Sequence, residues 1–76
     1  MACSRGIAWA ESVARRQPRL LQQPWPPHEG RAAEFARTKV ADLSEDPSVI
    51  DLLAQDVSAH AARRWRQLQE QVALRG

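Results

Sequence analysis

The chain has 76 residues, 43% of them hydrophobic, and a formal net charge of +2. This length allows one small domain, 1–76, with a thin core, because ordering each residue costs roughly 1.5 kcal/mol and few large apolar side chains offset that cost. The single cysteine, Cys3, excludes an intramolecular disulfide and fits a reducing compartment. We therefore expect self-association or a partner protein to add stability, and we expect 1–4 and 75–76 to fray.

The first predicted element is a helix over about 5–16. Ser4 is a candidate N-cap, and the apolar residues that follow form a broad face at helical spacing. This face comprises Ile7, Trp9, Ala10, Val13 and Ala14. Pro18 disfavours helical geometry in the residue before it, so the helix should end near Gln17. Because Glu11 interrupts the apolar stretch before it reaches the length of a secretory or membrane-spanning segment, we expect a cytoplasmic protein without membrane contact.

A proline-rich connector is predicted over 17–27. Its second part, Pro24-Trp25-Pro26-Pro27, favours an extended, polyproline-like path with one aromatic anchor. We expect Trp25 to insert into a groove of the protein's own surface. Pro24 and Pro27 also satisfy the bare PxxP spacing, so a solvent-exposed PxxP ligand is the alternative.

A second helix is predicted over about 28–43, because apolar residues keep helical spacing on one side of this segment. These residues are Ala32, Phe35, Ala36, Val40 and Leu43. The turn that follows, 44–46, is short, so this helix should form an antiparallel hairpin with the next one.

The strongest pattern is a long amphipathic helix over about 47–74. Asp46 is placed to cap free backbone N–H groups, and Pro47 takes the first helical position, where a missing N–H costs nothing. Inward-facing residues recur at a mean spacing of about 3.67, as in a nearly straight helix. They are Ile50, Leu53, Val57, Ala61, Trp65, Leu68 and Val72. The aspartates lie in the first half and the arginines in the second, and those nearest the ends complement the helix dipole.

The two hairpin helices differ in length. At 1.5 Å per residue the second helix spans only about 24 Å against roughly 43 Å for the long helix, so it shields the long helix only from Pro47 to about His60. The uncovered half would expose an apolar stripe, which is costly in water. We therefore expect an all-α fold, a small bundle in which the N-terminal region and a second copy of the chain share the cover of this stripe.

The candidate protein-interaction or dimer residues are the members of that stripe and the other two tryptophans. They are Ala61, Trp65, Leu68, Val72, Trp25 and Trp9. Small residues beside the stripe, Ala59 and Ala62, would allow two helices to approach closely in a symmetric dimer.

The titratable residues do not form a recognisable catalytic or metal site. Asp56 and His60 have the spacing of a helical metal pair, and His28 and Glu29 could approach the same region, but a surface hydrogen bond or ion pair is the commoner meaning of that spacing. Cys3 lacks an activating base and a shaped pocket. Neither an HExxH motif nor a glycine-rich phosphate loop is present in the sequence. We expect no enzyme activity, cofactor, metal or small-molecule substrate.

Arginine clusters favour a nucleic-acid interface as the alternative function. The candidate contacts to nucleic acid or to an acidic partner are Arg15, Arg16, Arg19, Arg63, Arg64 and Arg66. If the first helix covered the second half of the long helix, these clusters could merge into one basic surface with strongly salt-dependent binding. However, the acidic start of the long helix would repel the DNA backbone in a helix-turn-helix arrangement.

The charge is unevenly distributed along the chain: 1–31 carries +3, 32–58 carries −4 and 59–76 carries +3. Such a pattern would steer the chain toward a complementary protein more than toward DNA. The sequence thus favours a non-enzymatic protein-interaction module, a regulatory or inhibitory factor that binds a partner protein or homodimerises through the long helix. A nucleic-acid-binding accessory protein is the alternative.

Overall fold

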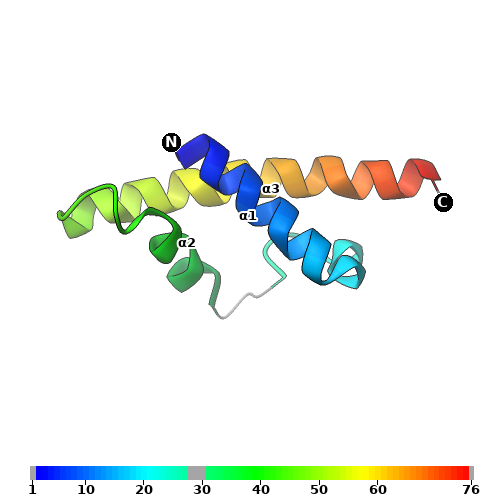
Figure 1. Cartoon of the computed structure of the whole chain (residues 1–76), viewed down its shortest axis with the longest axis horizontal. Coiled ribbons are helices and arrows are strands. Elements are labelled where there is room, and N and C mark those ends of the chain that lie inside the picture. The colour runs from blue at the N-terminus through cyan, green and yellow to red at the C-terminus, as the bar shows by residue number, and fades with distance from the viewer. Residues whose placement is uncertain (1, 28–30, 76) are drawn as a thin grey trace.

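The structure, a computed structural model, describes residues 2–27 and 31–75. These residues form three α-helices and one short 3-10 helix, and the described ranges contain no strand. The elements are α1 (Ala2–Arg16), η1 (Pro18–Gln22), α2 (Ala32–Val40) and α3 (Pro47–Arg75), shown in Figure 1. The prediction of an all-α fold is confirmed. Among the described helices, none combines the length and the apolar content that crossing a bilayer requires.

The start of α3 is the cap that the sequence predicts. Asp46 Oδ1 accepts a hydrogen bond of 2.9 Å from the backbone N–H of Ser48, and Pro47 is the first helical residue. The backbone N–H of Asp46 in turn donates to Ser44 Oγ at 3.1 Å. These bonds satisfy groups at the helix end that have no partner within the helix.

Helix α2 is shorter than the predicted 28–43. It covers only Ala32–Val40, and the part of the prediction at 28–30 lies outside the described residues. At the other end the backbone N–H of Leu43 donates to the Val40 carbonyl at 3.0 Å, which is a tight turn in place of another helical turn. Arg5 also donates to the Lys39 carbonyl at 2.9 Å and binds Asp42, so this end of α2 is held by α1. The predicted helical end at residue 43 is therefore wrong, because the chain turns early to make these contacts.

Helix α1 crosses the middle of α3 and then follows its second half (Figure 1). The crossing is close because Gly6 is buried there: a Cβ atom on Gly6 would lie 2.4 Å from the Val57 carbonyl oxygen and 3.0 Å from the Ala61 nitrogen. Further along, Arg64 Nε lies 3.7 Å from Glu11 Oε1. Both helices therefore run in the same general direction away from the crossing. The connector returns from η1 toward the middle of α3, and α2 covers the first half of α3.

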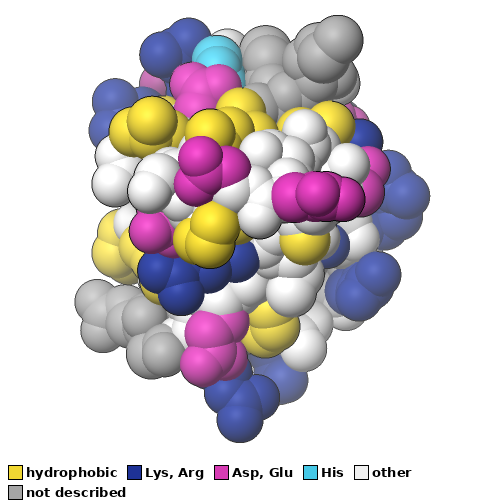
Figure 2. All heavy atoms as spheres, turned by 90° about the vertical axis from the view of Figure 1, so that its left-hand side faces the viewer, with side chains coloured by type: hydrophobic (Ala, Val, Ile, Leu, Met, Phe, Trp, Pro, Cys, Tyr) yellow, Lys and Arg dark blue, Asp and Glu magenta, His cyan; other side chains and the backbone are white. Residues whose placement is uncertain are grey.

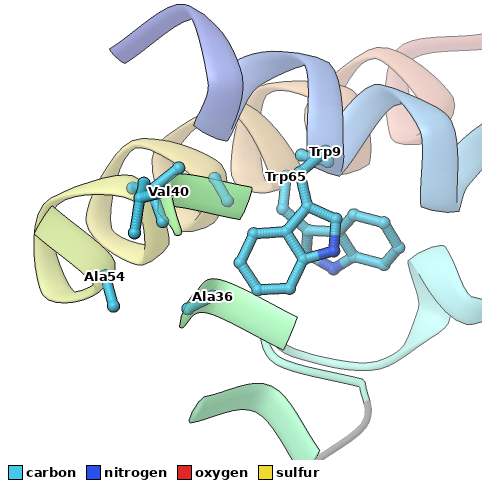
Figure 3. Packing of buried hydrophobic residues seen from close by; sticks show 8 residues of the cluster. Trp9, Ala36, Val40, Ala54 and Trp65 are labelled. Atoms are coloured by element: carbon cyan, nitrogen blue, oxygen red, sulfur yellow. The ribbon is translucent and has the colours of Figure 1, made fainter. Parts of the chain in front are cut away.

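Within the part of the chain that the structure describes, the core is one small cluster of eight buried residues, shown in Figure 3, with its aliphatic members toward the start of α3 and its tryptophans toward the second half. Around the start of α3, Val40 and Ala36 of α2 pack with Ala54 and Val57. Around the second half, Trp9 and Ala10 of α1 pack with Ala61 and Trp65. Trp65, Val40 and Val57 are the largest fully buried side chains. The aromatic end of the core therefore depends on α1 and the connector, and the aliphatic end depends on α2.

Candidate protein-interaction surface

The three tryptophans form one cluster inside the chain. The ring centroids of Trp9 and Trp25 are 4.9 Å apart and meet edge to face, and those of Trp25 and Trp65 are 5.2 Å apart. The indole Nε1 of Trp65 donates a 2.9 Å hydrogen bond to the Gln23 carbonyl. Trp25 of the connector lies against Trp65 of α3 in the structure. The N-terminal region thus covers the predicted stripe at this point.

A glutamine one turn beyond Trp65 fixes the same connector. Gln69 Nε2 donates to the Leu21 carbonyl at 2.9 Å and to the Gln23 carbonyl at 2.8 Å. Gln69 was not among the residues that the sequence pattern singled out. Its position four residues after Trp65, on the same side of the helix, is the signal that could have indicated it.

The predicted interface residues differ in how much of their side chains is exposed. Ala61 is fully buried, Trp65 is 1% exposed and Trp9 is 6% exposed, so these three contact other residues of the same chain. Trp25 and Leu68 are half-buried. Val72 is 51% exposed and lies beyond the cover that α1 and η1 provide. The stripe is therefore open to another molecule only at its end near Val72, and a broader exposed surface lies beside it.

Such a surface is a groove of about 610 Å³ between α2 and α3. Its walls are built mainly from small side chains, because alanines face one another from the two helices. The lining residues are Ala32, Ala33, Ala36 and Arg37 of α2 with Asp51, Ala54, Gln55, Ser58, Ala59 and Ala62 of α3. Short side chains leave the space between the helices open, where larger ones would fill it. The groove includes Ala59 and Ala62, which the sequence analysis associated with close helix approach.

One end of the groove is marked by an ion pair. Arg37 Nε and Nη2 both lie 2.9 Å from Asp51 Oδ1, and both side chains are more than half exposed. Within the described residues the second carboxylate oxygen of Asp51, Oδ2, accepts no hydrogen bond. Leu52, on the next position of α3, is 67% exposed. The groove therefore combines an apolar floor with a charged end that has unused acceptor capacity.

The charges of the molecule separate along α3. Figure 2 views the end formed by the turn between α2 and α3 and shows acidic side chains gathered on it. Exposed carboxylates in this region are Asp42, Glu45, Asp46, Asp51 and Asp56. The arginines of α3 lie in its second half, so the long helix is acidic at one end and basic at the other.

The arginines of the alternative interface are mostly available to solvent. Arg15, Arg16, Arg19, Arg63 and Arg66 are exposed. Arg64 differs, because it is half-buried, lies 3.7 Å from Glu11 and donates from Nη1 to Gln67 Oε1 at 3.1 Å. Arg64 is thus engaged within the chain.

The Asp56 and His60 pair is in contact in the structure. His60 Nε2 lies 3.5 Å from Asp56 Oδ1, as expected for residues four apart on one helix. His28 and Glu29 lie outside the described residues, and so does the side chain of Cys3. Within the described residues no group of three potential metal ligands occurs.

A second hollow of about 430 Å³ lies between α1 and α2 and contains a salt bridge. The Arg5 guanidinium holds both carboxylate oxygens of Asp42, with Nη2 to Oδ2 at 3.0 Å. The hydrogen bond from Arg5 lowers the pKa of Asp42, and the same bond raises the pKa of Arg5. This pair joins the start of α1 to the turn after α2 and remains partly exposed to water, which screens its charges. Its position indicates a structural role.

Comparison with known protein families, curated proteins and solved structures gives no match for this chain.

Proposed function

We propose that the chain is a non-enzymatic protein-interaction module, a small regulatory or inhibitory factor that uses the groove between α2 and α3 to bind another protein chain. The observation that carries this proposal is the groove itself: an open, alanine-lined surface of about 610 Å³ beside exposed Leu52. Exposed apolar surface of this kind is typical of contact sites. A cytoplasmic location stays a prediction from the sequence.

The shape of the groove supports a helical occupant. It runs between two helices whose facing side chains are small, so a third helix could approach their backbones closely. The ion pair of Arg37 and Asp51 at one end could orient such a helix, because charged groups at the edge of an interface set partner choice and association rate more than affinity.

The proposal can be tested with a variant that fills the groove. Ala59 is exposed, so Ala59→Arg should leave the fold intact while its side chain occupies the groove. Gln71→Arg adds the same charge to an exposed position of α3 outside the groove and is the matched control. Each purified, tagged protein is incubated with nuclease-treated lysate of its host, and the retained proteins are quantified.

We expect the wild type and Gln71→Arg to retain the same protein and Ala59→Arg to lose it, with unchanged helicity by circular dichroism. The proposal is wrong if the chain neither retains a protein above background nor associates with its own copy, or if Ala59→Arg binds as much as the wild type.

A nucleic-acid-binding accessory protein is the second candidate, supported by five of the six arginines named for it, which are exposed on α1, η1 and α3. Binding to a mixed-sequence DNA duplex would then fall steeply with salt, with a slope of about −0.9 for each phosphate neutralised. Arg63→Ala with Arg66→Ala should flatten that slope by roughly 2. Weak binding with no change of slope would exclude this role for the α3 cluster.

A further inference from the structure

We infer that the occupant of the groove is a second copy of this chain, with the two α3 helices antiparallel and crossing at Ser58 and Ala59. This inference rests on the proposed function, because it uses the same groove, and it names the partner. It is carried by the charge distribution of α3, by the small residues at its centre and by the register that connects the two.

The charge of α3 changes sign near its midpoint. Two of its three acidic residues, Asp51 and Asp56, follow the capping Asp46 and precede the centre, and only Glu70 lies in the second half, where four arginines outnumber it. Its arginines all follow the centre, at Arg63, Arg64, Arg66 and Arg75. Two such helices in antiparallel orientation place the acidic half of each against the basic half of the other. A parallel pair would place like charges together, which is unfavourable.

The crossing point falls where the side chains are smallest. Ser58, Ala59 and Ala62 line the groove at the centre of α3, and Ala59 is exposed. Helices approach most closely where they cross, and small side chains at that point permit the shortest distance between their axes. Ala32, Ala33 and Ala36 of α2 would form a wall beside the incoming helix.

A crossing of Ser58 on Ala59 of the second copy sets the rest of the register. Asp51 lies seven residues before Ser58, and Arg66 lies seven residues after Ala59. Each Asp51 is therefore opposite Arg66 of the other copy, twice in the dimer. Arg66 of the second copy would donate to Asp51 Oδ2, because Arg37 already donates to Oδ1. Arg66 is exposed and has no ion pair within the described residues.

The paired surface is long enough for a specific contact. The strip from Ser48 to Gln69 spans about 33 Å at 1.5 Å per residue. A stable interface takes about 800 Å² from each partner, and each chain exposes 5460 Å² in all. Because the strip mixes alanine with polar residues, we expect a reversible dimer that salt weakens.

The orientation is tested by disulfide cross-linking in a Cys3→Ser background, which removes the only native thiol. Ala59→Cys lies beside the twofold axis and should form a covalent dimer with its own copy. Ser48→Cys and Ala73→Cys should form no covalent dimer when the reducing agent is removed, because an antiparallel pair separates the two copies of Ser48 by about 30 Å. Cross-linking at all three positions would indicate a parallel pair and overturn the inference.

The register is tested by exchanging charges. Asp51→Arg and Arg66→Asp should each weaken dimerisation about tenfold, which corresponds to about 1.4 kcal/mol, and the double variant on one chain should return to near the wild-type affinity. Asp56→Arg changes the charge as Asp51→Arg does, outside the groove, and is the control. Sedimentation over a range of concentrations measures the dimer, and circular dichroism verifies folding. Arg66→Asp leaves the Arg37 pair intact and keeps the test valid if Asp51→Arg unfolds.

The outcomes separate this inference from the proposed function. A chain that is monomeric at all concentrations, yet retains another protein through an Ala59-dependent contact, overturns the inference and leaves the function. A monomer that retains nothing overturns both. A dimer that Ala59→Arg does not disrupt, or that the double charge exchange does not restore, places the contact elsewhere and also overturns the inference.

Discussion

The indole Nε1 of Trp65 donates a 2.9 Å hydrogen bond to the backbone carbonyl of Gln23, from the second half of α3 to the segment that follows η1. Trp65 is 1% exposed, so without that carbonyl its indole N–H would be buried away from water with no hydrogen-bond acceptor, which is costly. The bond therefore joins the aromatic end of the core to the connector that covers it. Trp25, which packs between Trp9 and Trp65, donates its Nε1 to no acceptor in the described residues.

This difference predicts unequal effects of two similar substitutions. Trp65→Phe removes a hydrogen bond and part of a fully buried ring, so it should lower the free energy of unfolding by roughly 1–3 kcal/mol. Trp25→Phe removes a similar volume from a half-buried site and breaks no hydrogen bond within the protein, so its effect should be clearly smaller. Urea denaturation followed by circular dichroism measures both. Equal losses would show that the Trp65 bond contributes nothing beyond ring size.

The close crossing at Gly6 predicts that alanine is destabilising there, although alanine is normally the better helix former by about 1 kcal/mol. The added Cβ would meet the Val57 carbonyl oxygen at 2.4 Å, and backbone atoms on both sides cannot yield locally. Gly6→Ala should therefore force α1 away from α3 and cost roughly 1–3 kcal/mol. Arg15→Ala, at an exposed position of the same helix, is the control and should leave the melting temperature nearly unchanged. A Gly6→Ala variant as stable as the wild type would contradict the crossing.

The sequence predicted those parts of the fold that depend on local pattern. The start of α3 follows from Asp46 and Pro47, whose cap and first-turn preferences do not depend on distant residues. The need for cover over the second half of α3 followed from helix lengths, because the second predicted helix is too short to reach it. The sequence did not show that the chain itself buries Trp65 and Ala61 almost completely, because a second copy of the chain could cover the same apolar stripe.

Contacts that depend on the crossing of α1 over α3 were not predicted. The salt bridge of Arg5 with Asp42 and the packing of Gly6 both require the side on which α1 crosses, which hydrophobic spacing alone does not determine. The small residues Gly6 and Ala10, four apart, are a pattern that indicates close helix packing and could have located the crossing. The groove was also missed, because alanines were considered only as contacts along the stripe of α3, without the facing alanines of α2.

The Arg5 and Asp42 salt bridge predicts a pH dependence of stability. The hydrogen bond from Arg5 lowers the pKa of Asp42 in the folded state. Its stabilising effect is therefore fully present above the ordinary carboxyl pKa of about 3.9 and is lost as the pH falls through the lowered value. The difference in melting temperature between wild type and Asp42→Asn should be constant from about pH 7 to 5 and should shrink below about pH 4.

Arg15→Gln removes a charge of the same sign from an exposed site of α1 and should not reproduce this pH-dependent difference. If Asp42→Asn and the wild type differed as much in strong acid as at neutral pH, the ionised carboxylate would not be the stabilising species. Because the pair is exposed, salt should also reduce its effect.

The two bonds of Gln69 predict a local loosening of the connector. Gln69 Nε2 donates to the carbonyls of Leu21 and Gln23, so Gln69→Ala removes both contacts and should lower the free energy of unfolding by about 1–2 kcal/mol. Trp65 still reaches the Gln23 carbonyl, so the aromatic cluster should persist while the segment around η1 opens more often. Trypsin cleavage after Arg19, which is exposed and lies within η1, should therefore accelerate more than the global stability loss accounts for. Gln71→Ala, at an exposed position of α3, should change neither quantity, and equal cleavage rates in the two variants would show that Gln69 does not hold the connector.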